Sequence, residues 1–256
     1  MLGIIPAAGK GTRVGDFCEH YPKVLFPYVG EPILFWNINW LIASGCNKIA
    51  IVVNYKKELI EKMLVIYAAK YPDNYWETDI YTVEQEELNG TAYSIAVVLK
   101  DIRISNPYDK VLMVFGDLIA ERALEHSDMW LNFVSVEEVD DYKRWVMVDI
   151  ENDNDVKAFI TKPQERPLTR MSWSGIFYVA HASYLTEAIE IAERLHKEPL
   201  KETCISEALA HIAFKAKVIP IINFGTYEDC VNSVGTTGID NAQKIVYNLI
   251  REGDEL

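Results

Sequence analysis

Cysteine is scarce in this sequence, and its few copies follow no metal-binding pattern. No two cysteines have Cys-x-x-Cys spacing, and no histidine lies nearby at the spacing of a zinc site. The four cysteines are Cys18, Cys46, Cys204 and Cys230. Unpaired thiols are typical of reducing compartments, so we expect reduced cysteines in a cytoplasmic protein.

Basic residues are outnumbered by acidic ones. Lysine and arginine total 25, aspartate and glutamate total 38, and the formal net charge is −13. An acidic protein of this kind binds poorly to nucleic acid and to anionic membrane surfaces, so we expect neither partner. A phosphate ligand would need a few local cations and backbone N–H groups to hold it.

Long apolar stretches are also missing. The first apolar run, residues 2–8, is too short for a signal peptide and ends in Gly9-Lys10-Gly11. No run approaches the roughly 20 apolar residues that a membrane-spanning helix needs. Internal repeats are absent, including the hexapeptide repeat of a β-helix. Half of the 256 residues are hydrophobic, which suits a single α/β domain over residues 1–256 with a sizeable core.

Short apolar runs alternate with helical patterns in the first half of the chain. The expected strands span residues 2–6, 49–53, 79–83 and 111–115, and the expected helices span 31–44, 59–67 and 91–99. This alternation predicts a three-layer α/β sandwich with a Rossmann-like, mainly parallel mixed sheet. The second half is less regular. Its expected strands span 131–136, 144–150, 156–160, 174–179 and 218–222, and its expected helices span 184–195, 204–214 and 241–250.

A loop of small residues follows the first expected strand and ends in a cation. Gly9 and Gly11 permit close approach of a ligand and positive φ angles. Successive N–H groups in such a loop form an anion-binding concavity, to which Lys10 and Arg13 add charge. The loop is neither a P-loop nor a dinucleotide fingerprint, because Val14 stands at the last glycine position. The alternative, an ordinary tight turn, stays open on the glycines alone.

Two further charged residues belong with this loop. Lys23 lies in a segment that Pro22 and Pro27 stiffen, so it could hold phosphates without a large ordering cost. Its spacing from Arg13 favours this interpretation over a solvated surface lysine. Asp117 follows an apolar strand, where ligands bind at the carboxyl edge of a parallel sheet. One carboxylate there suits Mg²⁺, although Asp117 could instead cap a following helix.

Together these segments resemble the sugar-nucleotide pyrophosphorylases, the family of glucose-1-phosphate thymidylyl- and uridylyltransferases. The matching segments, in chain order, are Gly9 to Arg13, Pro22-Lys23, Gln85 with Gly90-Thr91-Ala92, Gly116-Asp117, Lys162-Pro163, Ser174 to Phe177 and Gly225-Thr226. The resemblance implies an enzyme that joins a nucleoside triphosphate to a sugar 1-phosphate and releases pyrophosphate. It also implies Mg²⁺ as cofactor and a possible homo-oligomer. Residues 1–120 would form the nucleotide-binding half, and residues 121–256 the acceptor-binding half.

The same resemblance assigns roles to individual residues. Arg13 and Lys23 would stabilise phosphate charge, and Asp117 would bind Mg²⁺. The other nucleotide-binding residues would be Ala7, Ala8, Gly9, Lys10, Gly11 and Thr12 at the phosphates, and Gln85, Gly90 and Thr91 at the base. On the acceptor side we expect Lys162 at the acceptor phosphate, with Trp145, Trp173 and Gly175 nearby.

The acceptor half departs from the family pattern. Thr161 replaces a usual Glu, Trp173 replaces a usual Asn, and Trp145 falls near a usual Gly. Asn223 replaces the second metal-binding Asp, and Glu228 or Asp229 could compensate for that loss. The two tryptophans could offer flat faces to a ligand or pack in the core, and both interpretations stay open. Two alternatives to a sugar-1-phosphate nucleotidylyltransferase therefore stay open. They are a cytidylyltransferase for a non-sugar phosphate such as phosphocholine, and a non-catalytic nucleotide-binding module.

Overall fold

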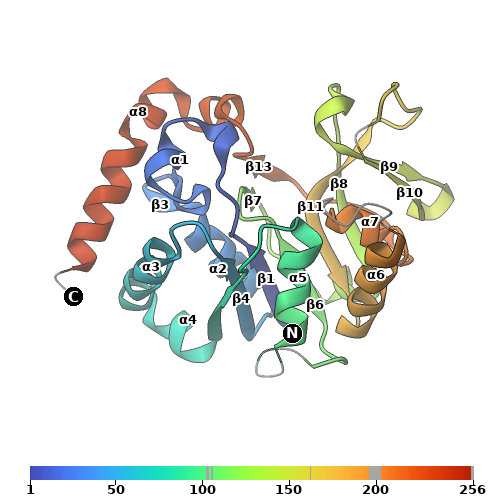
Figure 1. Cartoon of the computed structure of the whole chain (residues 1–256), viewed down its shortest axis with the longest axis horizontal. Helices are drawn as coiled ribbons and strands as arrows, with labels where there is room; N and C mark the ends of the chain where they lie inside the picture. Colours follow the sequence, from blue (N-terminus) through green and yellow to red (C-terminus); the bar gives the residue numbers. More distant parts are fainter. Residues whose placement is uncertain (102–103, 105, 162, 196–202, 255–256) are drawn as a thin grey trace.

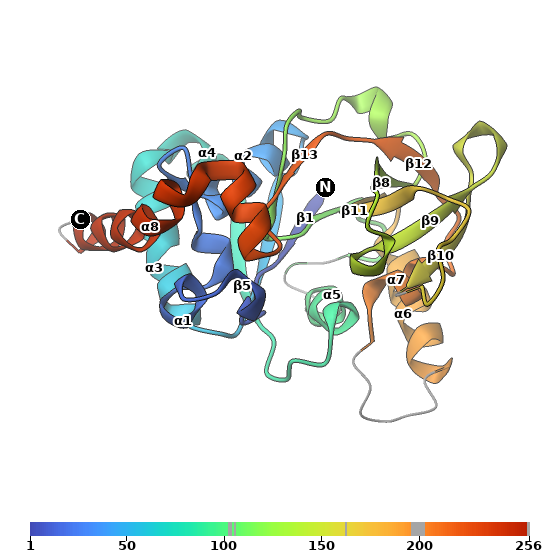
Figure 2. The ribbon, with the colours of Figure 1, turned by 90° about the horizontal axis from the view of Figure 1, so that it is seen from above.

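The computed structural model describes residues 1–101, 104, 106–161, 163–195 and 203–254. Within these ranges the chain forms a nine-stranded mixed sheet with helices on both faces (Figures 1 and 2). The strand order is β10-β9-β11-β6-β1-β4-β5, with β8 beside β11 and β12 beside β8. This arrangement confirms the predicted three-layer α/β sandwich.

The first half of the chain supplies the parallel part of the sheet. Its strands are β1 (Leu2–Pro6), β4 (Lys48–Val53), β5 (Asp79–Glu84) and β6 (Val111–Val114), and its helices are α1 (Phe17–His20), α2 (Ile33–Ala43), α3 (Lys57–Lys70), α4 (Pro72–Glu77) and α5 (Thr91–Lys100). Strand β1 pairs in parallel with β4 on one side and with β6 on the other. The order of connection therefore reverses between β1 and β6, and such a reversal opens a crevice at the carboxyl ends of the two strands.

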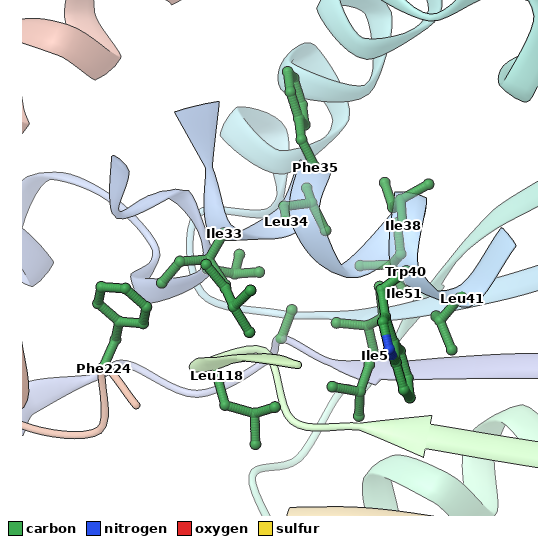
Figure 3. Close-up of a cluster of buried hydrophobic side chains, with 14 of the residues drawn as sticks. Ile5, Ile33, Leu34, Phe35, Ile38, Trp40, Leu41, Ile51, Leu118 and Phe224 are labelled. Atoms are coloured by element: carbon green, nitrogen blue, oxygen red, sulfur yellow. The ribbon is translucent and has the colours of Figure 1, made fainter. Parts of the chain in front are cut away.

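Alternating side chains of the buried strands divide the core into two layers. Ile5 and Ile51 pack with α2 and α3 on one face, whereas Ile4 and Val52 pack with α5 on the other. Figure 3 shows Ile5 and Ile51 close to Ile38 of α2. Both faces of these strands are apolar, as expected for a parallel sheet that helices cover on both sides.

The second half supplies antiparallel strands and the remaining helices. Its elements are β7 (Leu118–Ala120), β8 (Phe133–Glu138), β9 (Val146–Ile150), β10 (Val156–Thr161), β11 (Met171–Val179), α6 (Ala182–Leu195), α7 (Ile205–Leu209), β12 (Lys215–Val218), β13 (Ile221–Asn223) and α8 (Tyr227–Gly253). Strand β11 is antiparallel to β6, β8 and β9, so it joins the two parts of the sheet. Helix α8 kinks at Gly235 and packs back on α3 of the first half (Figure 1).

Several expected elements have different limits. The expected strand 218–222 is two strands, β12 and β13, because Pro220 between them cannot donate a ladder hydrogen bond. The helix expected over 204–214 ends at Leu209, and the helix expected over 241–250 begins at Tyr227. Helix α2 begins at Ile33, and the preceding Glu31–Pro32 forms the short strand β3, paired with β2 (Pro27–Tyr28). Among the residues described, no helix has the length and apolar character to cross a bilayer.

Candidate active site

A cavity of about 630 Å³ opens at the carboxyl ends of β1 and β6, where the strand order reverses. Its lining comes from four segments that are distant in sequence. These are Pro6 to Arg13 after β1, Lys23 and Val24, then Gln85, Leu88, Gly90, Thr91 and Ser94 around the start of α5, and Phe115 to Asp117 after β6. The structure therefore brings together all the predicted nucleotide-binding residues and the predicted catalytic residues.

The loop after β1 depends on one of its two glycines for its shape. Gly11 has φ +66°, and an added Cβ would lie 2.7 Å from the Cys18 sulfur and 2.9 Å from Lys23 Cβ. Only glycine fits this position. Gly9 differs from the expectation, because its φ is not positive and an added Cβ would meet nothing within 4 Å. Lys10 and Arg13 are exposed beside the cavity.

Lys23 is held inside the site by two oxygen atoms. Its Nζ donates to Asp117 Oδ2 at 2.6 Å and to the Gly225 carbonyl at 3.1 Å, and its side chain is only 13% exposed. A solvated surface lysine is therefore ruled out. The short turn that carries it (η2, Lys23–Leu25) lies between Pro22 and Pro27, as the sequence suggested.

Asp117 stands between the ends of two strands. It follows β6 and precedes β7, so it caps no helix. Its carbonyl accepts a hydrogen bond from Phe224 N–H at 2.8 Å. Burial raises the pKa of the Asp117 carboxyl, but the charge and hydrogen bond of Lys23, with the charge of Arg13, outweigh burial and hold it below its usual range. The group is ionised at neutral pH.

Asn223 is brought next to Asp117 by the pairing of β7 with β13, in which Asn223 faces Leu118. Its Oδ1 accepts a hydrogen bond from Gly225 N–H at 2.8 Å. One carboxylate and one amide oxygen fit Mg²⁺, which takes oxygen ligands and fills its remaining positions with phosphate and water. Across the described residues, no group of three or more His, Cys, Asp or Glu side chains could form a closed metal site.

Asp229, which the sequence offered as a substitute ligand, is already engaged. Its carboxylate accepts from Thr226 Oγ1 at 2.7 Å and from Arg144 Nη2 at 2.9 Å. Thr226 in turn accepts from Asp229 N–H and caps the start of α8. Glu228 is exposed in the first turn of that helix. Asp229 therefore supports the turn beside Lys23.

The opposite wall of the cavity begins with Gln85, which is 2% exposed. Its Nε2 donates to the Glu87 carbonyl at 2.9 Å, and its Oε1 accepts from Ser94 Oγ at 2.5 Å. Gly90 has φ +91°, and the Thr203 carbonyl occupies the place of any Cβ. Thr91 Oγ1 accepts from Ile205 N–H at 2.9 Å. Gly90 and Thr91 thus line the cavity while tied to the segment before α7.

Of the predicted acceptor residues that the structure describes, Trp145, Trp173 and Gly175 are not part of the cavity lining. Trp173 is 5% exposed, donates through Nε1 to the Ile176 carbonyl at 2.9 Å and packs on Phe115, whose ring lies 5.2 Å away. Its indole has no open face for an acceptor in this arrangement. Gly175 has φ +97°, and a Cβ there would lie 2.7 Å from the side chains of Phe115 and Leu118.

Two other acceptor residues remain. Trp145 is half-buried, and the Arg144 guanidinium lies 5.7 Å from its ring centre. Lys162 lies outside the described residues. Thr161, which replaces the usual Glu, is within 3.1 Å of Ser206 Oγ, so its hydroxyl is hydrogen-bonded inside the protein.

Motif matching missed several residues of the site. Leu88, Ser94 and Phe115 all line the cavity, and none belongs to a recognised short motif. A weak signal existed for Ser94, because it lies one helical turn after Gly90 on the same face of α5. Phe115 ends the apolar run before Gly116-Asp117, and its position next to a predicted metal ligand was the available clue.

Comparison with known proteins agrees with this geometry. A model of the family described as nucleotidyl transferase matches residues 2–218. The UTP--glucose-1-phosphate uridylyltransferase AglF of Haloferax volcanii is 29% identical over 201 residues, which cover 73% of this chain and 76% of that protein. The bifunctional protein GlmU of Methanocaldococcus jannaschii is 29% identical over 230 residues, 90% of this chain and 51% of that protein. The chain spans about half the length of the GlmU relatives that it matches.

Solved structures share the fold at low sequence identity. A UDP-glucose pyrophosphorylase complexed with UDP-glucose superposes with a TM-score of 0.72 at 18% identity, covering 96% of this chain and 98% of that one. A putative glucose-1-phosphate thymidylyltransferase from Bacillus anthracis gives 0.72 at 16% identity, covering 94% and 96%. With a family model that matches most of its length, this chain belongs to the nucleotidyl transferase family.

Proposed function

We propose that this protein is a sugar-1-phosphate nucleotidylyltransferase, which transfers a nucleoside monophosphate from a nucleoside triphosphate to a sugar 1-phosphate and releases pyrophosphate. One observation carries the proposal. The cavity at the strand-order reversal unites an anion-binding loop, a buried lysine and an ionised aspartate. The names of the relatives, such as the uridylyltransferase AglF, support the same reaction class and suggest UTP as the first donor to test.

The residues would act by positioning and by neutralising charge. An oxygen of the acceptor phosphate attacks the α-phosphorus in line; the new P–O bond forms as the bond to the β-phosphate bridging oxygen breaks. The backbone of the Gly9–Thr12 segment and the Arg13 guanidinium would hold the β- and γ-phosphates as pyrophosphate departs. Lys23 would stabilise charge on the α-phosphate. No general base is required, because a phosphate monoester is already anionic at neutral pH.

A metal ion would complete this arrangement. We propose that Asp117 and Asn223 hold Mg²⁺, which when bound would neutralise phosphate charge. Support comes from the pairing of β7 with β13, which places Asn223 opposite Leu118, the residue after Asp117. From the family resemblance we also propose a homo-oligomer, and from the acidic composition and the unpaired cysteines a cytoplasmic protein without nucleic acid or membrane partners. Light scattering of the purified protein measures the oligomeric state.

The acceptor is the part of the substrate pair on which this chain departs from its relatives. We expect glucose 1-phosphate to be a poor acceptor, because Thr161 bonds to Ser206 and has no carboxylate to hold sugar hydroxyls. A deoxy- or amino-sugar phosphate should give a higher kcat/KM. Glucose 1-phosphate emerging as the best acceptor of a panel would contradict this expectation.

A pyrophosphate-release assay tests the proposal as a whole. The four common triphosphates are each paired with a panel of sugar 1-phosphates and alkyl phosphates, with Mg²⁺ present and Asp117→Asn as the inactive control. Release with a sugar 1-phosphate supports the proposal, and release with phosphocholine alone would favour the cytidylyltransferase. No release with any pair, together with measurable triphosphate binding, would leave the non-catalytic module.

A further inference from the structure

The end of β4 and the residues after it hold the loop after β1 at both of its ends. At the amino end, Ala7 N–H donates to the Val52 carbonyl at 2.8 Å. Tyr55 N–H donates to the Ala8 carbonyl at 3.4 Å. At the carboxyl end, Tyr55 Oη donates to the Cys18 carbonyl at 2.8 Å, within α1. The residues between these contacts include those that the proposed function places at the β- and γ-phosphates.

Lys56 adds a charged contact at the carboxyl end of the loop. Its ammonium donates to the carbonyls of Glu19 at 2.6 Å and His20 at 2.9 Å, the last two residues of α1. Carbonyls at the end of a helix lack intrahelical partners, and a lysine placed there satisfies them. Because α1 has only four residues, it depends on contacts of this kind rather than on its own hydrogen bonds.

The backbone of Lys56 has a conformation that few residues with a side chain adopt. Its φ is +51° and its ψ is +42°, in the left-handed region. Such a conformation is costly and persists where the surrounding structure requires it. The strained residue directly precedes α3, and its side chain reaches back to α1. The strain therefore coincides with the contact that holds α1 beside the loop.

The loop itself has little to keep its shape. Gly9, Lys10, Thr12 and Arg13 are all exposed, and two of residues 9–13 are glycines. Glycine loses more conformational freedom than any other residue when it becomes ordered. A ligand that had to order this loop would lose affinity to that entropy, and fixing the two ends of the loop in advance reduces the loss.

We propose that Lys56 is a positioning residue for the triphosphate, which holds α1 and thereby orders in advance the loop that contacts the β- and γ-phosphates. This inference rests on the proposed function, which places those phosphates at the loop. Lys56 is not part of the cavity lining, so it acts through α1. Its removal should weaken the binding of ligands that carry β- and γ-phosphates and spare ligands that lack them.

Calorimetric titration with UTP and with UMP, without an acceptor and at one Mg²⁺ concentration, tests the proposal without turnover. UMP has the same base, ribose and α-phosphate but lacks the two outer phosphates. Lys56→Met removes the ammonium and keeps an apolar stem, whereas Lys56→Arg keeps a charged donor. Lys57→Met is the matched control, because the adjacent lysine pairs with Glu84 at the surface instead of with α1. The measured quantity is the ratio of the two dissociation constants.

A second variant separates the ammonium from the backbone strain. Lys56→Gly also removes the ammonium, but glycine adopts a positive φ without strain. We expect Lys56→Gly to melt at a higher temperature than Lys56→Met and to show the same loss of preference for UTP. Affinity that follows the melting temperature across these two variants would show that Lys56 acts only on stability, and would overturn the inference.

We expect the parent protein to bind UTP more tightly than UMP, and Lys56→Met to reduce that preference roughly tenfold, the effect of about one lost hydrogen bond to a charged group. Lys56→Arg and Lys57→Met should keep most of it. An unchanged ratio in Lys56→Met, or equal losses for UTP and UMP, overturns the inference, while pyrophosphate release by the parent still supports the proposed function. A parent that binds UTP no more tightly than UMP contradicts both, because the loop then holds no outer phosphates.

Discussion

Lys23 and Asp117 form an ion pair in which each charge stabilises the other. The carboxylate is partly buried, and its pKa stays below the usual range because the Lys23 ammonium is 2.6 Å away. The lysine also bonds to the Gly225 carbonyl, so its position depends on the turn before α8. The residue that we propose to neutralise phosphate charge therefore also maintains the charge of the proposed metal ligand.

Replacing Lys23 by methionine removes both effects, and two measurements distinguish them. We expect turnover to fall by about 10²–10³, the typical cost of one electrostatic contact in a transition state. Without the ammonium, burial dominates and the pKa of Asp117 rises, so the carboxylate loses its charge at a higher pH than in the parent. As the pH is lowered, Mn²⁺ binding to the triphosphate-loaded protein should therefore be lost at a higher pH in Lys23→Met than in the parent. Coincident pH curves for parent and variant would contradict the coupling.

Short motifs located residues of the cavity well, because the shape of a loop of small residues next to a strand has local causes. The phosphate loop, Lys23 and Asp117 all line one cavity, as the sequence predicted. The direction of a single side chain in an irregular strand has non-local causes. Trp173 lies in β11 near the bulge around Gly175, and its contacts with Phe115 and the Ile176 carbonyl turn it into the core. No pattern in the neighbouring sequence indicates that direction.

At the scale of elements, the start of α5 is fixed by a glycine rather than by a capping side chain. Gly90 precedes the helix with φ +91°, and the Thr203 carbonyl fills the space beside it. The hydrogen bond from Ala92 N–H to that carbonyl, 3.2 Å long, ties α5 to the segment before α7. The side of the cavity that we propose to hold the base therefore depends on a contact between residues more than 100 positions apart.

Gly90→Ala should destabilise the protein by about 1–3 kcal/mol, the usual cost of a strained backbone position, with a further loss from the contact with Thr203. Chemical denaturation measures the change in the free energy of unfolding. Gly9→Ala is the control, because Gly9 has no positive φ and open space around its Cα. Equal stability losses in the two variants would show that the Gly90 conformation is not constrained.

Strand β8 carries Glu137, an acidic residue whose surroundings disfavour the ionised carboxylate. Burial raises the pKa of Glu137, and the charge of Asp229 raises it further. Because the pKa of Glu137 is higher in the folded state, its contribution to the free energy of unfolding is fully present below the unfolded pKa, about 4.3. That contribution is lost as the pH rises through the folded-state pKa. Glu137→Gln should therefore raise the melting temperature at pH 7 and leave it nearly unchanged at pH 4.

The neighbouring Glu138 provides the control for this prediction, because its side chain is 60% exposed and pairs with Arg170 on the surface. Glu138→Gln should have little effect at either pH. A melting temperature that falls at pH 7 in Glu137→Gln would show that the ionised carboxylate has a stabilising partner.

Apolar runs predicted the strands of the parallel half closely, since buried strands need hydrophobic residues on both faces. The last helix was predicted less well. Its first part, residues 227–240, contains Gly235 and Gly238 and few apolar residues, so it lacks a helical pattern. Packing against the first half stabilises this part and is not a local cause, whereas the Thr226 cap at its start is local.

At the scale of the whole molecule, an ion pair within the second half connects the turn before β9 to the start of α8 beside the site. Arg144, in the short turn before β9, donates to Asp229 at the start of α8, and the side chains are 36% and 14% exposed. The same helix start follows the turn whose Gly225 carbonyl binds Lys23. A shift of α8 relative to the turn before β9 would therefore displace the lysine.

Arg144→Ala should reduce kcat roughly tenfold, since small misplacements of catalytic groups are costly. It should change the stability by no more than about 1 kcal/mol, because the pair is partly exposed. Arg170→Ala removes a more exposed pair with Glu138 and Asp140 and should leave kcat unchanged. Restoration of part of the activity by Arg144→Lys would support a charge contact, and equal kcat in all variants would contradict it.

The return of α8 to the first half has a consequence for synthesis on the ribosome. Gly253 approaches Ile66 of α3, Lys62 pairs with Asp254, and Val246 belongs to the same buried cluster as Tyr67. A growing chain that has completed β1 to β6 still exposes the apolar surface that α8 will cover (Figure 1). The half that emerges first thus finishes folding last, and during translation it remains a surface to which chaperones can bind.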